Sequence, residues 1–134
     1  MLIVIRSKNM EVYFFWAATI MSVVTFAVHT FVGGPVVAKP LLENNDLPKA
    51  SKWLNYYTWH VTTVFTFSMG GAYAYVALNP NRPELVVFLT VVTAALCFLS
   101  AAVALKGNIN PFRFPSTSLF ATVSLLGLVG LLVK

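Results

Sequence analysis

The stretch LVVFLTVVTAALCFLSAAVAL, residues 85–105, contains no Asp, Glu, Lys or Arg. An α-helix rises about 1.5 Å per residue, so roughly 20 apolar residues cross the hydrocarbon core of a bilayer, which is about 30 Å thick. Three more uncharged stretches occupy residues 12–38, 53–81 and 114–133. The sequence therefore predicts an all-α integral membrane protein, a four-transmembrane-helix up-down bundle in which residues 1–134 form a single membrane domain.

Composition supports this class and excludes others. The chain is 58% hydrophobic and 10% charged, whereas soluble domains carry about 25% charged residues. The net charge of +5 comes from Lys and Arg at the ends of the apolar stretches, where cations meet lipid phosphates. Since no basic patch with interleaved aromatic residues is present, we expect no nucleic-acid partner. Cys97 is the only cysteine, which excludes an internal disulfide.

Turn-forming residues divide the chain into its expected helices. Gly33-Gly34-Pro35 should end the first helix, because Gly weakens a helix and Pro removes a donor. Asp46 should cap the second helix, with Pro48 in its first turn. The short breaks between the later helices predict antiparallel neighbours. We expect helices near residues 11–32, 49–78, 84–105 and 116–133.

Orientation rests on few charges. Lys and Arg divide almost evenly between the two expected sides of the membrane. Arg6 and Lys8 stand close to the first helix and favour cytoplasmic termini. The compartment expected for such a protein is a bacterial inner membrane or an organellar membrane.

Small and hydroxylated residues recur on one face of each expected helix. The first helix carries Ala18, Ser22, Thr25 and His29 at spacings of three and four, and the last carries Ser124, Gly127 and Gly130. Such faces allow helix backbones to approach closely and to form interhelical hydrogen bonds in lipid. The pattern predicts tight packing of all four helices.

The candidate site residues are His29, His60 and Cys97. One loop joins the end of the first helix to the start of the second, so both histidines should lie in the same leaflet, facing the interior. The third helix runs back towards that leaflet and brings Cys97 with it. Ionisable residues within spans usually face a bundle interior or a cavity and mark functional sites.

Several roles for these residues stay open at this point. A neutral histidine can join two helices by a hydrogen bond without binding anything. His29 and His60 together can ligate haem b from two facing helices. The two histidines with Cys97 can hold copper or zinc. Either histidine can also donate a hydrogen bond to a quinone or a lipid headgroup. Cys97 alone is typical of a small packing residue.

Catalytic patterns are sparse, which favours a non-enzymatic role. No Asp or Glu lies within the uncharged stretches, so the carboxylate relay of proton pumps is missing. We therefore expect an accessory, non-catalytic subunit that contacts the lipid bilayer and packs against a larger bioenergetic membrane complex. A homo-oligomer of this chain is the other assembly that the sequence allows. The alternative is a small haem-, metal- or quinone-binding redox protein that uses His29 and His60.

Overall fold

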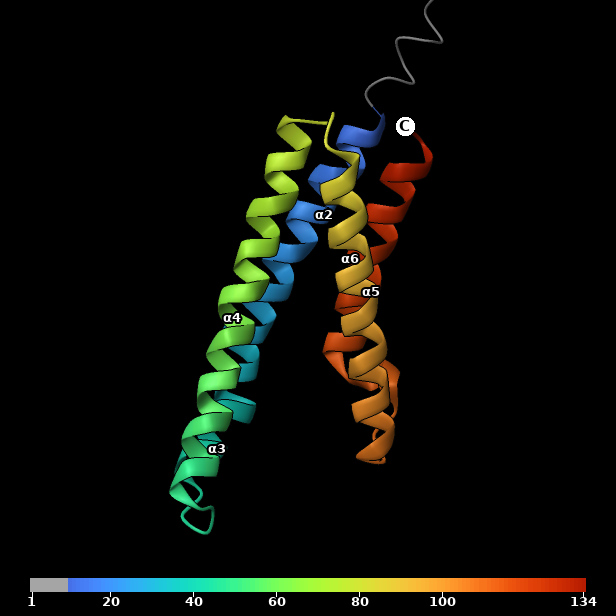
Figure 1. Ribbon diagram of the computed structural model, residues 1–134. Helices are drawn as coiled ribbons and strands as arrows, with labels where there is room; N and C mark the ends of the chain where they lie inside the picture. Colours follow the sequence, from blue (N-terminus) through green and yellow to red (C-terminus); the bar gives the residue numbers. More distant parts are fainter. Residues whose placement is uncertain (1–9) are drawn as a thin grey trace, which may run out of the picture.

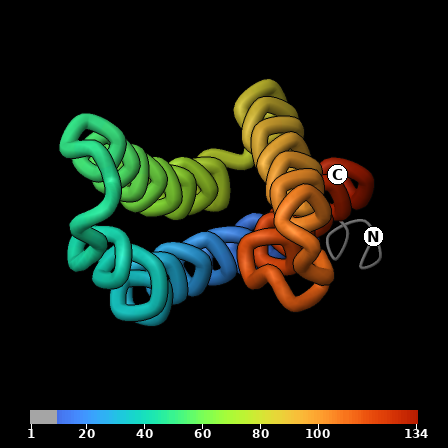
Figure 2. The backbone as a smooth tube through the Cα atoms, turned by 90° about the horizontal axis from the view of Figure 1, so that it is seen from below, coloured from blue at the N-terminus to red at the C-terminus, as the bar shows by residue number. Residues whose placement is uncertain are grey.

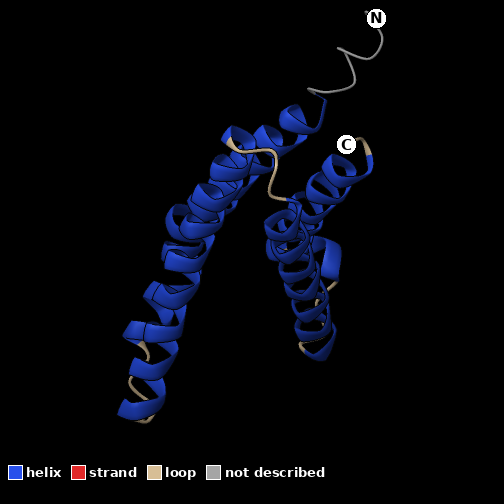
Figure 3. Cartoon of the chain, turned by 45° about the horizontal axis from the view of Figure 1, so that its top comes forward, coloured by secondary structure: helices blue, strands red, loops and turns tan. Residues whose placement is uncertain are grey.

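The structure, a computed structural model, describes residues 10–134, and this part of the chain is helical with short connections (Figure 3). Four helices are long and apolar enough to cross a membrane; they span 34, 30, 24 and 18 residues. The elements are α2 (Met10–Ala27), η1 (Val28–Val32), η2 (Gly34–Ala38), α3 (Lys39–Glu43), α4 (Lys49–Leu78), α5 (Pro83–Lys106), η3 (Pro111–Arg113) and α6 (Pro115–Leu132).

The helices form two arms that meet at one end (Figure 1). The long arm has two helical segments. The first is α2 with its continuation through η1, η2 and α3, and the second is α4, which packs along α2. The short arm consists of α5 and α6, which also pack on each other. Helix α2 additionally contacts α6, whereas α4 and α5 make little contact. Viewed along the arms, the ribbons of α4 and α5 stand apart (Figure 2).

The core lies where the arms meet. Tyr73 of α4 is fully buried there and packs with Leu89 of α5 and Val123 of α6. Phe15 of α2 is buried beside it, against Val86. All four helices therefore contribute to two hydrophobic clusters, which Leu85 joins by packing against both.

Two glycines of α6 permit this close approach. A Cβ added at Gly130 would lie 2.5 Å from Cε1 of Phe15, and one added at Gly127 would lie 2.6 Å from the Tyr73 hydroxyl. Ser124, on the same face, donates a hydrogen bond of 3.2 Å to the carbonyl of Thr90. The small face predicted for the last helix is thus an interhelical contact.

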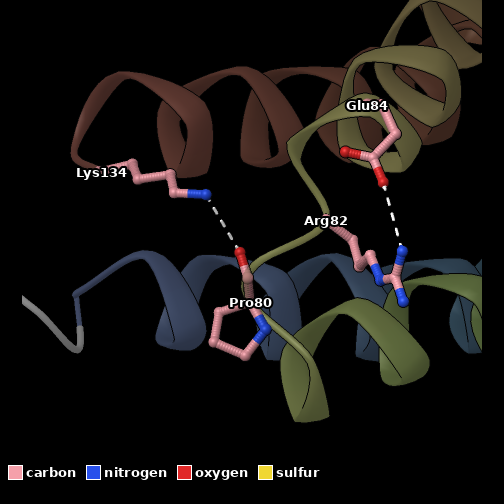
Figure 4. A network of polar contacts seen from close by, with 4 residues as sticks. All are labelled: Pro80, Arg82, Glu84 and Lys134. Atoms are coloured by element: carbon pink, nitrogen blue, oxygen red, sulfur yellow. Dashed lines mark hydrogen bonds and ion pairs between the residues drawn. The ribbon is translucent and has the colours of Figure 1, made fainter.

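At this end of the molecule one polar contact links α6 to the α4–α5 turn, and another lies at the start of α5 (Figure 4). Lys134 donates a hydrogen bond of 3.1 Å to the carbonyl of Pro80 in the α4–α5 turn. Arg82 and Glu84 form an ion pair of 3.9 Å across the start of α5. Because these side chains are exposed, each contact contributes at most about 1 kcal/mol.

The first helix does not end where the sequence analysis placed its end. Gly33-Gly34-Pro35 lies within a helix that continues to Glu43, so the predicted boundary at residue 32 is wrong. The backbone passes this point through two π-type turns, in which Gly33 N–H bonds the carbonyl of Val28 and Lys39 N–H bonds that of Gly34. The wider turn accommodates the proline ring, which would clash with a carbonyl in a regular α-helix.

The other boundaries agree closely with prediction: α4 begins and ends at the predicted residues, and the ends of α5 and α6 differ by one residue. Pro48, not Asp46, is the residue before the first turn of α4. The start of α2 and the end of α6 lie at the same end of the molecule (Figure 1). Arg6 and Lys8, on which the expected orientation depends, lie outside the described residues.

Tight packing of all four helices is found only where the arms meet. Away from that end, side-chain hydrogen bonds form within each arm. In the short arm, the Ser100 hydroxyl lies 2.7 Å from that of Ser116 and 2.8 Å from that of Thr117. In the long arm, His29 bonds the backbone of α4. The short α4–α5 turn therefore joins helices that diverge instead of packing along their length.

Candidate functional site

His29 is stacked on Trp59 between the two helices of the long arm. Their ring centroids are 4.0 Å apart and the planes are inclined by 21°. His29 Nε2 also lies 3.1 Å from the carbonyl oxygen of Trp59. Trp59 of α4 therefore holds the imidazole in two ways, by stacking on its face and by a hydrogen bond with its Nε2.

The local sequence explains why the rings can stack. Gly33 follows His29 by four residues and so lies on the same side of the helix. A Cβ added at Gly33 would lie 2.7 Å from Cη2 of Trp59, whereas one added at Gly34 meets no atom within 4 Å. Only the first glycine of the pair is needed to admit the indole. Such π-type turns occur frequently at functional sites.

The hydrogen bond defines the protonation of the neutral His29 ring. A carbonyl oxygen can only accept, so Nε2 must carry the proton and donate it to Trp59. In the neutral ring, Nδ1 then keeps its lone pair. Nδ1 is the atom of His29 that remains able to accept a hydrogen bond or to coordinate a metal.

His60 has a different environment. Its ring is exposed and lies edge-on to Tyr56, with centroids 4.6 Å apart and planes inclined by 88°. The expectation that both histidines face the interior is therefore wrong for His60. His29, by contrast, is partly buried between α2 and α4.

The two histidines border different hollows. A cleft of about 440 Å³ lies between the arms and is lined by His29 and Thr25 from the first helix, Thr66 from α4, and Ser116 and Phe120 from α6. A second hollow of about 450 Å³, the loop-end cavity, lies between η2–α3 and α4 and is lined by Lys39, Glu43, Tyr56 and His60. Trp59 borders both.

The cleft is apolar in character. Its threonine hydroxyls bond carbonyls of their own helices: Thr25 that of Met21, and Thr66 that of Thr62. Among the described residues that line the cleft, none is charged. The cleft therefore suits an apolar surface better than an ion or a hydrophilic solute.

Cys97 lies in the short arm, where its thiol is 3.4 Å from the carbonyl of Thr117. It is partly buried and packs against the hydrophobic core, which is the role expected of a small packing residue. Within residues 10–134, no three His, Cys, Asp or Glu side chains form a group suited to a metal ion. The structure thus does not gather Cys97 with the two histidines, and cofactor binding by His29 and His60 stays a prediction.

Sequence reasoning missed the roles of Trp59, Gly33 and Lys39. The sequence pattern assigns no role to Trp59 and predicts that Gly33 ends a helix. The four-residue spacing of His29 and Gly33 is a signal that both face the same neighbour. Lys39 could not be placed, because the helix that carries it was expected to end before it.

Comparisons with protein-family models, curated proteins and solved structures found no match to this chain. Its function is therefore argued from the geometry above.

Proposed function

We propose that this chain is an integral membrane protein and a non-catalytic subunit of a larger membrane assembly, in which the cleft between its arms receives an apolar helix of another subunit. The divergence of α4 and α5 is the observation that carries the proposal. Beyond the contact of α2 with α6, it leaves a cleft between the arms whose lining includes the small and hydroxylated residues Gly33, Thr62 and Ser116. Residues of this kind favour helix contact within a bilayer.

The chemistry of the cleft supports a packing role over transport. Transport of ions or protons across a bilayer uses charged or ionisable groups along the path. The cleft offers hydroxyls that are bonded to their own backbones, and His29, whose Nε2 is bonded to Trp59. A partner helix would cover the apolar side chains of the cleft and would leave these bonds unchanged.

A photo-crosslinking experiment tests the proposal. A benzoylphenylalanine is placed at Val36, which lines the cleft and is 69% exposed, or at Phe98, a residue of α5 that is 76% exposed and is not among those lining the cleft. In native membranes, position 36 should give one discrete adduct with a second, different polypeptide, identified by mass spectrometry, and position 98 should give mainly lipid adducts. An adduct of twice the mass of this chain would show that the cleft receives a second copy of this chain and not a different subunit. Lipid adducts alone at both positions would contradict the proposal.

A second candidate function rests on the lone pair of His29 Nδ1. An apolar molecule with a hydroxyl, such as a quinol, would match a largely apolar cleft that contains one imidazole acceptor. Haem ligation by His29 and His60 is less favoured by the geometry, since their rings border different hollows. Optical absorbance and organic extraction of the purified protein distinguish these: a Soret band supports haem, an extracted quinone supports the quinol, and a colourless protein without extractable quinone supports the packing role.

A further inference from the structure

The loop-end cavity combines opposite charges with apolar walls. Its volume of about 450 Å³ falls within the range of about 300–1,000 Å³ that is common for small-molecule sites. Lys39 and Glu43 stand on one helix, one turn apart, and His60 and Tyr56 stand on α4 across the cavity. Leu42 contributes to its apolar wall.

The length of the first helix places this cavity at the level of lipid headgroups. Residues 12–38, which carry no charge, rise about 40 Å in a helix, and a bilayer including its headgroups is about 40–45 Å thick. With Glu11 at one interface, Lys39 therefore lies at the other. The aromatic residues at the start of α4, among them Trp53 and Tyr57, match the belt that marks a membrane interface.

The two charges of the cavity are paired only weakly with each other. Lys39 Nζ and Glu43 Oε1 are 3.8 Å apart, and their side chains are 69% and 66% exposed. A pair this long and this exposed contributes little to stability, so a ligand can replace it at small cost. A ligand that carried only negative charge would be attracted by Lys39 but repelled by Glu43.

The walls offer unused polar groups and space. Within residues 10–134, the buried Thr30 Oγ1, which borders the cavity, has no hydrogen-bond partner. The phenol of Tyr56 and the imidazole of His60 add donors on the opposite side. Next to Gly34 the cavity is open, because an added Cβ would meet no atom within 4 Å.

We propose that the loop-end cavity binds the headgroup of a phospholipid that carries both a phosphate and a primary ammonium, as phosphatidylethanolamine does. The phosphate accepts from Lys39 and from the donors on α4, while the ammonium donates to Glu43. The apolar wall around Trp59 and Leu42 contacts the glycerol and the first carbons of the acyl chains. A choline headgroup fits less well, since its quaternary nitrogen has no hydrogen to donate to the carboxylate. The inference rests on the membrane placement proposed above and is independent of the partner subunit.

The test measures the melting temperature of the purified full chain in a non-ionic detergent during titration with lipid. Phosphatidylethanolamine should raise it saturably, and phosphatidylcholine with the same acyl chains should have at least a tenfold weaker apparent affinity. Glu43→Gln should remove the preference between the two lipids, and Lys39→Gln should weaken the binding of both, because both carry the phosphate. Lys106→Gln, which replaces another exposed lysine at the end of α5, is the matched control and should retain both the affinity and the preference.

Each contrary result overturns the proposal in a distinct way. Equal affinity for the two lipids, an unchanged preference in Glu43→Gln, or unchanged binding of both lipids in Lys39→Gln would show that the cavity does not recognise the headgroup. Stronger binding of phosphatidylglycerol would show that Lys39 acts alone as an anion site. Equal binding of free phosphoethanolamine would assign the chemistry to a soluble ligand. None of these outcomes changes the crosslinking expected at Val36, so the two proposals fail separately.

Discussion

Replacing Gly127 by Ala should destabilise the protein, and replacing Gly71 by Ala should not. At Gly127 the new methyl group would lie 2.6 Å from the Tyr73 hydroxyl and would also contact the Thr90 hydroxyl too closely. Tyr73 is fully buried, so its ring has no free space to move into. At Gly71, also within a helix, the added Cβ meets no atom within 4 Å.

The magnitude follows from comparing the two variants. Both gain the helix preference of Ala over Gly, about 0.8–1.0 kcal/mol, so this contribution cancels in the difference. What remains is the cost of overpacking at Gly127, typically about 1–3 kcal/mol. Unfolding in detergent by increasing SDS, followed by tryptophan fluorescence, should therefore give Gly127→Ala a free energy of unfolding about 1–3 kcal/mol below that of Gly71→Ala. Values within about 0.5 kcal/mol of each other would refute the close α6 contact.

Two further substitutions test local contacts. Gly33→Ala should separate His29 from Trp59, because the added Cβ would lie 2.7 Å from the indole. This variant should have lower stability and altered tryptophan fluorescence. Gly34→Ala is the control and should change neither, because its added Cβ meets no atom within 4 Å. Ser100→Ala removes the hydroxyl contacts between α5 and α6. It should lower the free energy of unfolding by about 0.6 kcal/mol, and by no more than about 1.7 kcal/mol, which is the range for hydrogen bonds between membrane helices. An effect as large for the exposed Ser118→Ala would contradict that explanation.

The helices could be predicted because their cause is local. A stretch such as residues 85–105 has enough apolar length to define a helix without reference to its neighbours. Gly33-Gly34-Pro35 led to the one large error in a helix boundary, since helix preferences are weak and neighbouring structure overrides them. Here the packing of Trp59 against Gly33 and the two π-type turns keep the chain helical.

The arrangement of the helices in space was harder to predict than the helices themselves. Small residues recur on every helix, so the pattern indicates that each has a packing face but not which helix it packs on. Ser100 pairs with Ser116 and Thr117 within the short arm, and His29 pairs with Trp59 within the long arm. The arms diverge because helices pair within each arm, and the sequence pattern alone does not predict which helices pair.

The candidate site shows the same limit. Equal depth along the helices predicted that His29 and His60 lie near the same level, but the direction in which each ring points depends on the turns around it. Residue 60 follows Trp59 directly, so its side chain points about 100° further around α4, towards Tyr56 and the loop-end cavity. Lys39 joins that cavity only because the first helix continues to Glu43.

The most direct test of the account is the sidedness of the loops in sealed membrane vesicles. In a Cys97→Ala background, single cysteines replace Asn45, Asn81 or Asn108, three exposed residues in the connections between helices. A membrane-impermeant maleimide should label positions 45 and 108 from one side and position 81 from the other, because α4 separates position 45 from position 81 and α5 separates position 81 from position 108. Labelling of all three positions from the same side, with the vesicles intact, would contradict the membrane-spanning arrangement on which both proposals depend.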